Sequence, residues 1–219
     1  MPAASVVLAT RNKGKIREME FLLAPFGVST AGLDAFPSLG VLEEDGTSFA
    51  ENALLKARAA CDATGLPAVA DDSGLEVEGL GGAPGIRSAR YASVDGKDAP
   101  DTANVEKLLR DLREMHGAKR RARFRCVIAA CAPGVESITA EGTWEGVIAE
   151  RASGNNGFGY DPVFVDPTSG LTAAQMTAAE KNMRSHRFAA ASGLLRLWPA
   201  FWAAYLSRGG LFGTQSHTP

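Results

Sequence analysis

The sequence is poor in cysteine and nearly balanced in charge. Its 219 residues include three cysteines, Cys61, Cys126 and Cys131, and none has a nearby Cys or His at the spacing of a zinc site. Each lies in an apolar stretch, so we interpret them as buried reduced thiols and expect a cytoplasmic protein. The formal net charge of -2, from 23 Lys and Arg against 25 Asp and Glu, excludes a protein that holds nucleic acid by bulk electrostatics.

Long hydrophobic runs are also lacking. The longest candidate, residues 194–206, contains Arg196 and Pro199 and is shorter than the ~18 apolar residues of a membrane span. The first residues lack the pattern of a secretory signal, so we expect no membrane association. With 45% hydrophobic and 22% charged residues, the composition is typical of a globular protein. We predict one domain over residues 1–206 and a flexible tail over 207–219.

Strand-like and helix-like segments alternate along the chain, which predicts an α/β fold with a mixed sheet. Apolar or alternating runs predict strands at residues 5–9, 67–70, 123–131, 137–149 and 160–165, with a further strand possible at 75–78. Helical periodicity predicts helices that begin near residue 15, at 48–63, at 102–115 and at 188–206, the last bent near Pro199. Ser48 with Glu51, and Thr177 with Glu180, have the spacing of capping boxes.

The turn between the first strand and the first helix contains Lys13, Gly14 and Lys15. Free backbone N–H groups and the positive end of the helix dipole favour anions there, and two lysines would add charge for a polyphosphate. It is not a Walker A loop, because the upstream glycine is missing and Ile16 stands where Ser or Thr is required. A phosphate site and a solvated basic turn both stay open.

Carboxylates gather in two places, at residues 43–45 and at Asp71 and Asp72. Mg²⁺ typically takes one or two carboxylates together with substrate phosphates, although an acidic surface loop would have the same composition. The two aspartates follow a predicted strand, and the carboxyl ends of strands are where ligands collect in α/β sheets. Asn52 and Lys56 share one face of the capped helix, which we expect to face a cleft while Phe49 and its helical neighbours meet the core.

Two later segments carry the remaining candidate groups. In residues 157–162, aromatic rings stand among glycines beside an aspartate, which suits stacking on a flat ligand, or else a tight loop with its rings packed inward. Lys181 and residues 185–187 bring possible donors for keto oxygens or anions to a helix start. The basic string at 119–125 alternates with apolar residues, which predicts a solvated strand edge rather than a nucleic-acid site.

Together these motifs resemble the inosine triphosphate pyrophosphatase family, also called Ham1-like or dITP/XTP pyrophosphatases. The resemblance extends from Val6 to about Leu206 and follows the family's order through residues 8–15, 48–57, 70–75, 81–86, 157–162 and 185–187. Arg11 stands where many relatives carry glycine, and Asn155 and Asn156 replace a more glycine-rich lead into the aromatic loop.

The resemblance implies an elongated mixed β-sheet flanked by helices, with two lobes around a nucleotide-binding cleft, in a homodimer. It implies hydrolysis of ITP, dITP and XTP to the monophosphate and pyrophosphate, with Mg²⁺ as cofactor. Asp72 corresponds to the catalytic carboxylate and a metal ligand, and Glu43 to the second metal position, with Glu44 beside it as the alternative. The substrate-binding positions it implies are Thr10, Arg11, Asn12, Lys13, Gly14, Lys15, Lys56, Ser73, Phe158, Gly159, Tyr160, Asp161, Lys181, His186 and Arg187.

Base selection has a simple physical basis under this hypothesis. Hypoxanthine and xanthine present an O6 acceptor that Lys181, His186 or Arg187 can satisfy, whereas adenine presents a donor there. The alternatives are a nucleotide sensor without turnover, a Maf-like pyrophosphatase of modified pyrimidine nucleotides, and a nucleic-acid binder using residues 119–125. Turnover would distinguish the enzyme from a sensor, and a panel of nucleoside triphosphates would distinguish it from a Maf-like pyrophosphatase. A nucleic-acid binder would show affinity for nucleic acid that falls steeply with salt.

Overall fold

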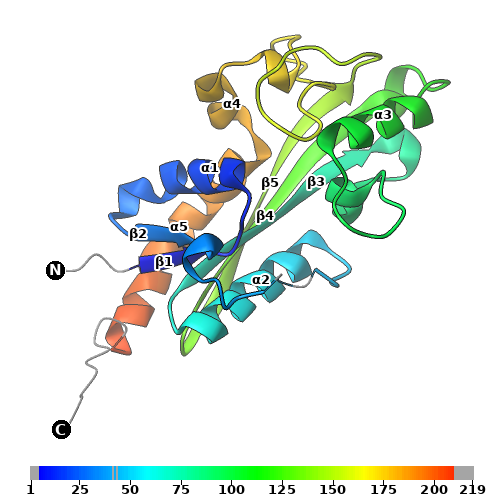
Figure 1. The fold of residues 1–219 in the computed structure, drawn as a ribbon. Helices are drawn as coiled ribbons and strands as arrows, with labels where there is room; N and C mark the ends of the chain where they lie inside the picture. Colours follow the sequence, from blue (N-terminus) through cyan, green and yellow to red (C-terminus); the bar gives the residue numbers. More distant parts are fainter. Residues whose placement is uncertain (1–4, 41, 43, 210–219) are drawn as a thin grey trace, which may run out of the picture.

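The computed structural model describes residues 5–40, 42 and 44–209, and their fold is a curved mixed sheet with helices on both faces (Figure 1). The strand order is β2-β1-β3-β4-β5-β6. The strands are β1 (Ser5–Leu8), β2 (Ser29–Gly32), β3 (Ala68–Val77), β4 (Arg121–Ala132), β5 (Val135–Ile148) and β6 (Phe164–Val165). The helices are α1 (Lys13–Leu23), α2 (Phe49–Thr64), α3 (Asp101–Asp111), α4 (Ala178–Arg184) and α5 (His186–Ser207).

The sheet changes from parallel to antiparallel at β3. β1 pairs in parallel with β2 and β3, and β3 to β6 are joined by antiparallel pairings. The long strands β3, β4 and β5 run from one end of the molecule to the other (Figure 1). One sheet therefore supports both lobes, the first around α1, α2 and α5 and the second around α3. The mixed α/β fold predicted from the sequence is confirmed.

Apolar side chains form a core on each side of the sheet and a further core in the second lobe. One cluster joins α1 and α5 to β1 and β4, and a second packs α2 against the opposite face. The third joins α3 to the far ends of β3, β4 and β5, around Leu108, Phe124 and Phe164. The three cysteines are buried in the first two clusters, as predicted.

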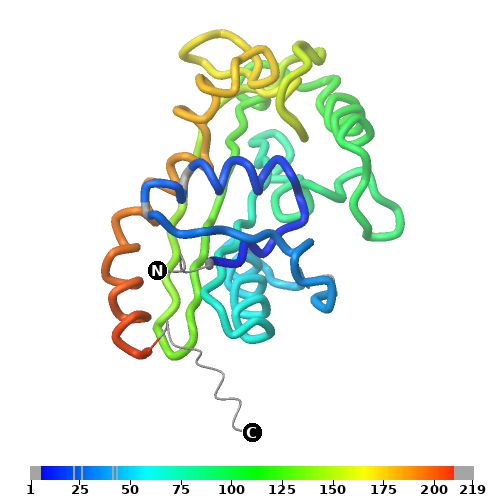
Figure 2. The backbone as a smooth tube through the Cα atoms, turned by 60° about the vertical axis from the view of Figure 1, so that its left-hand side comes forward, coloured from blue at the N-terminus to red at the C-terminus, as the bar shows by residue number. Residues whose placement is uncertain are grey.

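Helix α5 lies along the β4–β5 hairpin (Figure 2), and a glycine permits the close approach. A Cβ atom on Gly142 of β5 would lie 2.2 Å from the carbonyl oxygen of His186, well inside van der Waals contact. Because α5 begins at His186, this contact fixes the start of the helix, and so the position of His186 and Arg187, against the sheet. No helix in the described part of the chain is long and apolar enough to cross a membrane.

The structure corrects several predicted elements. Residues 67–70 and 75–78 belong to one strand, β3, so Asp71 and Asp72 lie inside a strand and not at its end. The basic string is not on a sheet edge, because β4 lies between β3 and β5, where Arg125 pairs with Glu76 and Glu141. Only Phe164–Val165 of the predicted strand 160–165 is extended, and β2 was not predicted.

The helix ends agree better with the predictions from the sequence than the strands do. The capping box of Thr177 and Glu180 is present. Ser48 caps α2 by accepting from the Glu51 N–H, but the Glu51 carboxylate accepts from Thr47 instead of completing the box. Pro199 lies inside α5, which extends through Ser207, so the predicted tail begins no earlier than residue 208. Residues 210–219 lie outside the described part of the chain.

Candidate active site

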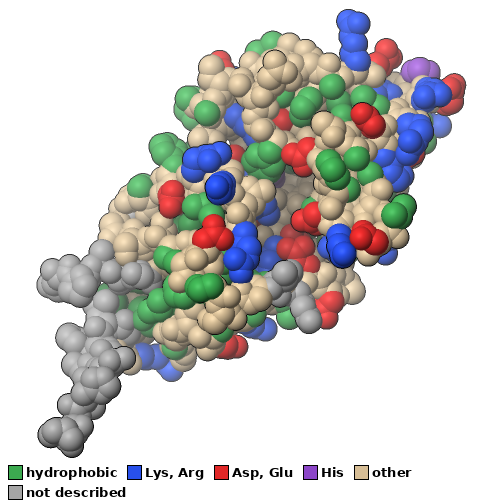
Figure 3. All heavy atoms as spheres, in the orientation of Figure 1, with side chains coloured by type: hydrophobic (Ala, Val, Ile, Leu, Met, Phe, Trp, Pro, Cys, Tyr) green, Lys and Arg blue, Asp and Glu red, His purple; other side chains and the backbone are tan. Residues whose placement is uncertain are grey.

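A cavity of about 370 Å³ opens between the two lobes. Figure 3 shows the hollow near the middle of one face, with acidic and basic side chains gathered around it. Its walls come from the loop after β1, from α2, β3 and α3, and from the starts of α4 and α5. Segments far apart in the sequence therefore meet in one space.

The cavity brings together nearly all of the residues that the sequence marked as a site. Those that line it are Thr10, Arg11, Asn12, Lys15, Lys56, Asp72, Ser73, Phe158, Gly159, Tyr160, Asp161, Lys181, His186 and Arg187. Lys13 and Gly14 lie in the first turn of α1 beside it, outside the set of lining residues. Glu43 lies outside the described residues, whereas its neighbour Glu44 lines the cavity.

The start of α1 differs from the expected free helix terminus. The Asn12 side chain caps the helix and accepts from the Gly14 and Lys15 N–H groups at 2.8 and 3.1 Å, so these donors already have a partner. The Arg11 guanidinium donates to the Leu39 carbonyl oxygen at 2.5 Å and so holds the loop that follows β2. What α1 offers an anion is chiefly the Lys15 ammonium, which reaches into the cavity.

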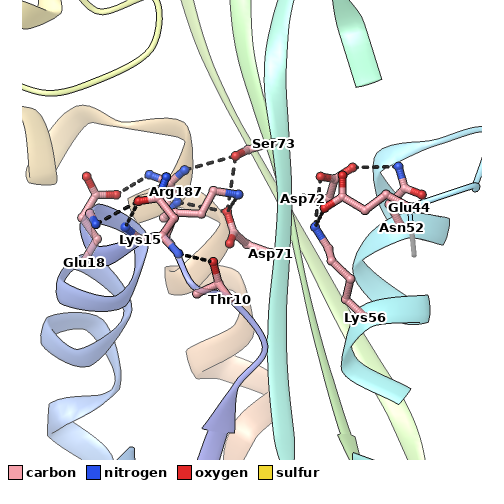
Figure 4. A network of polar contacts seen from close by, with 12 residues as sticks. Thr10, Lys15, Glu18, Glu44, Asn52, Lys56, Asp71, Asp72, Ser73 and Arg187 are labelled. Atoms are coloured by element: carbon pink, nitrogen blue, oxygen red, sulfur yellow. Dashed lines mark hydrogen bonds and ion pairs between the residues drawn. The ribbon is translucent and has the colours of Figure 1, made fainter. Parts of the chain in front are cut away.

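Neighbouring aspartates of β3 point to opposite faces of the sheet, because successive side chains alternate along a strand (Figure 4). Asp71 faces α1 and α5. It pairs with the Lys15 ammonium at 3.1 Å and the Arg187 guanidinium at 3.3 Å, and it accepts from the Ser73 hydroxyl. Glu18 of α1 is a second partner of Arg187. Burial alone would raise the pKa of Asp71, but Lys15 and Arg187 hold it well below its usual range.

Asp72 faces α2, where it meets the face of the helix that was expected to look into a cleft (Figure 4). Its carboxylate accepts from the Asn52 amide at 3.1 Å and the Lys56 ammonium at 3.2 Å. The same ammonium donates to Glu44 at 2.7 Å. Burial raises the pKa of Asp72 despite the cation beside it, and the two carboxylates raise the pKa of Lys56 against the effect of its own burial.

The geometry around Asp72 is compatible with a divalent cation. Among the described residues no group of three or more His, Cys, Asp or Glu side chains gathers as a metal site. Mg²⁺ does not require one, because it commonly takes one or two carboxylates and completes its shell with substrate phosphates and water. Asp72 and Glu44 already converge on one cationic atom, the Lys56 nitrogen, so these two carboxylates fit the ion.

Residues 157–161 form a tight turn around a buried carboxylate on the wall of the cavity. Asp161 accepts from the Phe158 N–H at 2.8 Å and from the Lys181 ammonium at 2.5 Å. Gly157 has φ of +78°, and a Cβ atom there would lie 1.9 Å from an Asp161 oxygen, so only glycine fits. Burial raises the pKa of Asp161, opposed by Lys181.

Only one of the two aromatic rings in this turn is offered to a ligand. Tyr160 is buried, and its hydroxyl donates to the Ser88 carbonyl oxygen at 2.8 Å. Phe158 is partly exposed in the cavity, and the Lys181 ammonium lies 4.8 Å from its ring centre. The turn therefore satisfies both expectations at once, with one ring packed inward and one free to stack.

His186, predicted as a possible donor, is a buried side chain at the start of α5. Its ring stacks on Phe124 at 4.8 Å between centres, and its Nδ1 is buried with no hydrogen-bond partner in the described part of the chain. Burial, together with the positive charges of Arg187 and Lys181, lowers its pKa well below the ordinary value, so the imidazole is neutral. A neutral imidazole still offers one N–H donor and one acceptor.

Some residues of the site were not found from the sequence. Glu18 and Phe124 are partners of Arg187 and His186, and Asp101 and Asn104 line the cavity from α3. Glu18 lies one turn after Lys15, so helical spacing was available as a signal. Phe124 alternates with arginines on β4, whereas nothing local marks Asp101 or Asn104.

These features define a member of the Ham1 family: its sequence profile matches residues 6–197, and the chain belongs to it. A protein of Nitratidesulfovibrio vulgaris named dITP/XTP pyrophosphatase is 55% identical over 206 residues, covering 92% of this chain and 99% of that protein. The dITP/XTP pyrophosphatase of Salmonella typhimurium is 53% identical over 186 residues, covering 83% and 91%. The resemblance inferred from the motifs is confirmed.

Two solved structures of Ham1 proteins superpose on most of this chain. The HAM1 protein of Coxiella burnetii superposes with a TM-score of 0.80 at 41% identity, covering 90% of this chain and 99% of that one. The Staphylococcus aureus Ham1 protein superposes with a TM-score of 0.75 at 40% identity, covering 91% and 98%.

Proposed function

We propose that this chain hydrolyses dITP, XTP and ITP to the nucleoside monophosphate and pyrophosphate. The observation that carries the proposal is the shared cavity, which is lined both by the charged groups Asp72, Lys56 and Lys15 and by Phe158 and Lys181. A polyphosphate needs the first set and a purine the second. The relatives to which the chain is similar are named as pyrophosphatases of two of these nucleotides, dITP and XTP.

The phosphate end must accept several negative charges. Lys15 and Lys56 bring two ammonium groups to it, each held by a carboxylate of β3. Because the lysines are fixed before the substrate arrives, little reorganisation is needed to place their charge against the phosphates. Asp72 and Glu44 raise the pKa of Lys56 against the effect of its burial, so this ammonium stays charged in the site.

Asp72 is the group best placed to act on the attacking water. In the reaction a bond forms between water oxygen and the α-phosphorus, the bond from phosphorus to the α–β bridging oxygen breaks, and pyrophosphate leaves. The proton of the water passes to a base, and burial has raised the pKa of Asp72, which strengthens it as a proton acceptor. The Asn52 amide orients the carboxylate at 3.1 Å.

Asp72 and Glu44 would hold Mg²⁺, next to the Lys56 ammonium that both carboxylates contact. When bound, the ion supplies positive charge that offsets the triphosphate and fixes the leaving group. That Glu43 is the second metal ligand remains a prediction. The homodimer and the cytoplasmic location also remain predictions.

The purine end selects by hydrogen bonding. The base stacks on Phe158, and the Lys181 ammonium donates to the O6 atom that hypoxanthine and xanthine present. Adenine carries an amino group at this place, so donor would face donor, a mismatch that can reduce kcat/KM by about 10⁴. Arg187 is held by Asp71 and Glu18 and serves chiefly to connect α5 with α1 and β3.

The test is a panel of ITP, dITP, XTP, GTP, ATP and a modified pyrimidine triphosphate, assayed with Mg²⁺ for both pyrophosphate and monophosphate. We expect the first three to be hydrolysed at least a hundredfold faster, as kcat/KM, than ATP, a ratio that about 3 kcal/mol of selectivity supplies. Binding of ITP without release of pyrophosphate would replace the enzyme by a sensor. Preference for the pyrimidine nucleotide would favour the Maf-like alternative.

A further inference from the structure

The turn that carries Phe158 is tied to the opposite wall of the cavity by a contact that the proposed reaction does not use. The Gly159 N–H donates to the Asp101 carboxylate at 2.7 Å, across 58 positions of sequence. Next to it, the Tyr160 hydroxyl donates to the Ser88 carbonyl oxygen at 2.8 Å. One turn of chain therefore has two fixed points on the segment between β3 and α3.

The anchor for the first contact is itself rigid. Asp101 stands at the first position of α3, where a carboxylate is stabilised by the positive end of the helix dipole. Asn104, buried one turn later, accepts from the Ala92 N–H and donates to the Ala89 and Ala99 carbonyl oxygens. These bonds hold the start of α3 against residues 89–99, so the Asp101 carboxylate has a defined position.

The Phe158–Gly159 peptide is held at both of its polar groups. Its carbonyl oxygen, on Phe158, accepts from the Asp161 N–H at 3.3 Å within the turn, and its N–H, on Gly159, donates to Asp101. Gly159 has a left-handed φ of +61°, and a Cβ atom built on it would meet no atom within 4 Å, so side-chain packing does not hold this residue. The Asp101 contact therefore ties the peptide to another segment of the chain, and its loss would loosen the peptide that carries the Phe158 ring.

Asp101 is also a negative charge on the wall of a cavity that is to receive a polyanion. By electrostatics alone, such a charge weakens binding of the substrate. A carboxylate at this place therefore needs a stabilising role that outweighs the repulsion. Its hydrogen bond with the Gly159 N–H is such a role.

We propose that Asp101 is a positioning residue for the purine: its carboxylate fixes the Phe158–Gly159 peptide and so the ring on which the base stacks. This inference rests on the proposed function. It assigns to α3 a part in base recognition through the backbone, with no contact between Asp101 and the nucleotide.

The test compares Asp101→Ala, which removes the acceptor, with Asp101→Asn, which keeps an oxygen acceptor in the same place. Asp101→Glu retains the charge but displaces the acceptor by one methylene group. Glu106→Ala is the matched control, because Glu106 is an exposed acid on the same helix that does not line the cavity. KM and kcat are measured for dITP, together with the inhibition constant of inorganic triphosphate, which has no base.

For Asp101→Ala and Asp101→Glu we expect KM for dITP to rise about five- to tenfold, the effect of losing one solvent-exposed hydrogen bond of ordinary strength. We expect kcat to stay within about twofold, and the inhibition constant of inorganic triphosphate to stay unchanged or fall. Asp101→Asn should restore KM to within about twofold of wild type, and Glu106→Ala should change nothing. Thermal unfolding of each variant checks that the exposed substitution leaves the fold intact.

An unchanged KM in both Asp101→Ala and Asp101→Glu would overturn the inference. So would an equal loss of affinity for dITP and inorganic triphosphate, which would mark a general disturbance of the site. If the wild-type chain binds dITP without hydrolysing it, the reaction proposal falls, and dissociation constants from calorimetry replace KM in the same comparison. A wild-type chain that binds no nucleotide would overturn both.

Discussion

The adjacent aspartates of β3 should respond in opposite ways when each is replaced by asparagine. Asp71→Asn removes a carboxylate whose side chain is 1% exposed and which pairs with Arg187, 2% exposed, and with Lys15. Breaking a buried ion pair by removing one partner costs about 3–5 kcal/mol of unfolding free energy. Arg187 keeps Glu18, so we expect the lower end, about 3 kcal/mol. For a chain of this size that is a fall in Tm of about 6–12 °C.

Asp72→Asn should leave stability nearly unchanged. Burial raises the pKa of Asp72, so ionising this group costs more in the folded chain than in the unfolded one, and a neutral side chain of the same shape removes that cost. Lys56 keeps Glu44 at 2.7 Å. We expect Tm to change by less than about 3 °C, while kcat falls by about 10³ because the proton acceptor is lost.

The pH dependence separates the two further. The pKa of Asp71 is lowered in the fold, so its stabilisation is complete above the unfolded value of about 4 and is lost as the pH falls below it. The gap in Tm between wild type and Asp71→Asn should therefore close in acid. For Asp72, whose pKa is raised, ionisation costs stability as the pH rises, so any gain from Asp72→Asn should be larger at pH 7 than at pH 4.

Differential scanning calorimetry at pH 2, 4 and 7, with initial rates of pyrophosphate release from dITP, measures all of these quantities. Equal losses of Tm in the two variants at pH 7 would refute the assignment of one aspartate to the fold and the other to the reaction. Full turnover by Asp72→Asn would refute its role as base, whatever its stability.

Three further outcomes follow from the site. Gly157→Ala places a methyl group against Asp161 and should lower kcat/KM for dITP about a hundredfold, a steady-state measurement in which normal activity would contradict the steric argument. Removal of divalent ions by EDTA should abolish turnover, and added Mg²⁺ should restore it in the wild type. It should not restore turnover in the double variant Asp72→Asn, Glu44→Gln. Turnover that is unaffected by EDTA would exclude a required divalent ion. Because the pKa of His186 is lowered in the fold, stability should fall as the pH drops below about 6.5, and urea unfolding of His186→Gln should show a flatter profile; parallel profiles would show that the fold does not lower the pKa of His186.

Local sequence signals were sufficient for most of the helices and for many of the residues that line the cavity. Asn52 and Lys56 were placed on one face by their four-residue spacing, and the structure has both on Asp72. The Thr177 cap is likewise a property of neighbouring residues. Such features depend on bonds within one or two turns of chain, so they can be read before the fold is known.

Strand continuity and sheet order were decided by the tertiary structure. β3 continues through two charged residues because Asp71 and Asp72 find cations on opposite faces, an outcome that no apolar pattern signals. β4 takes its central place by pairing with β3 and β5, and there Arg125 meets Glu76 and Glu141, 49 and 16 positions away.

The chemistry of the site likewise depends partly on the sequence and partly on the tertiary structure. The sequence determined which groups are available: a carboxylate at 72, lysines at 15, 56 and 181, and an aromatic ring at 158. Only the folded chain decided that Asp71 is an ionised structural partner, that His186 is neutral, and that Asp101 meets Gly159. Protonation and positioning depend on burial and on charges brought together from distant segments, and these exist only after the chain has folded.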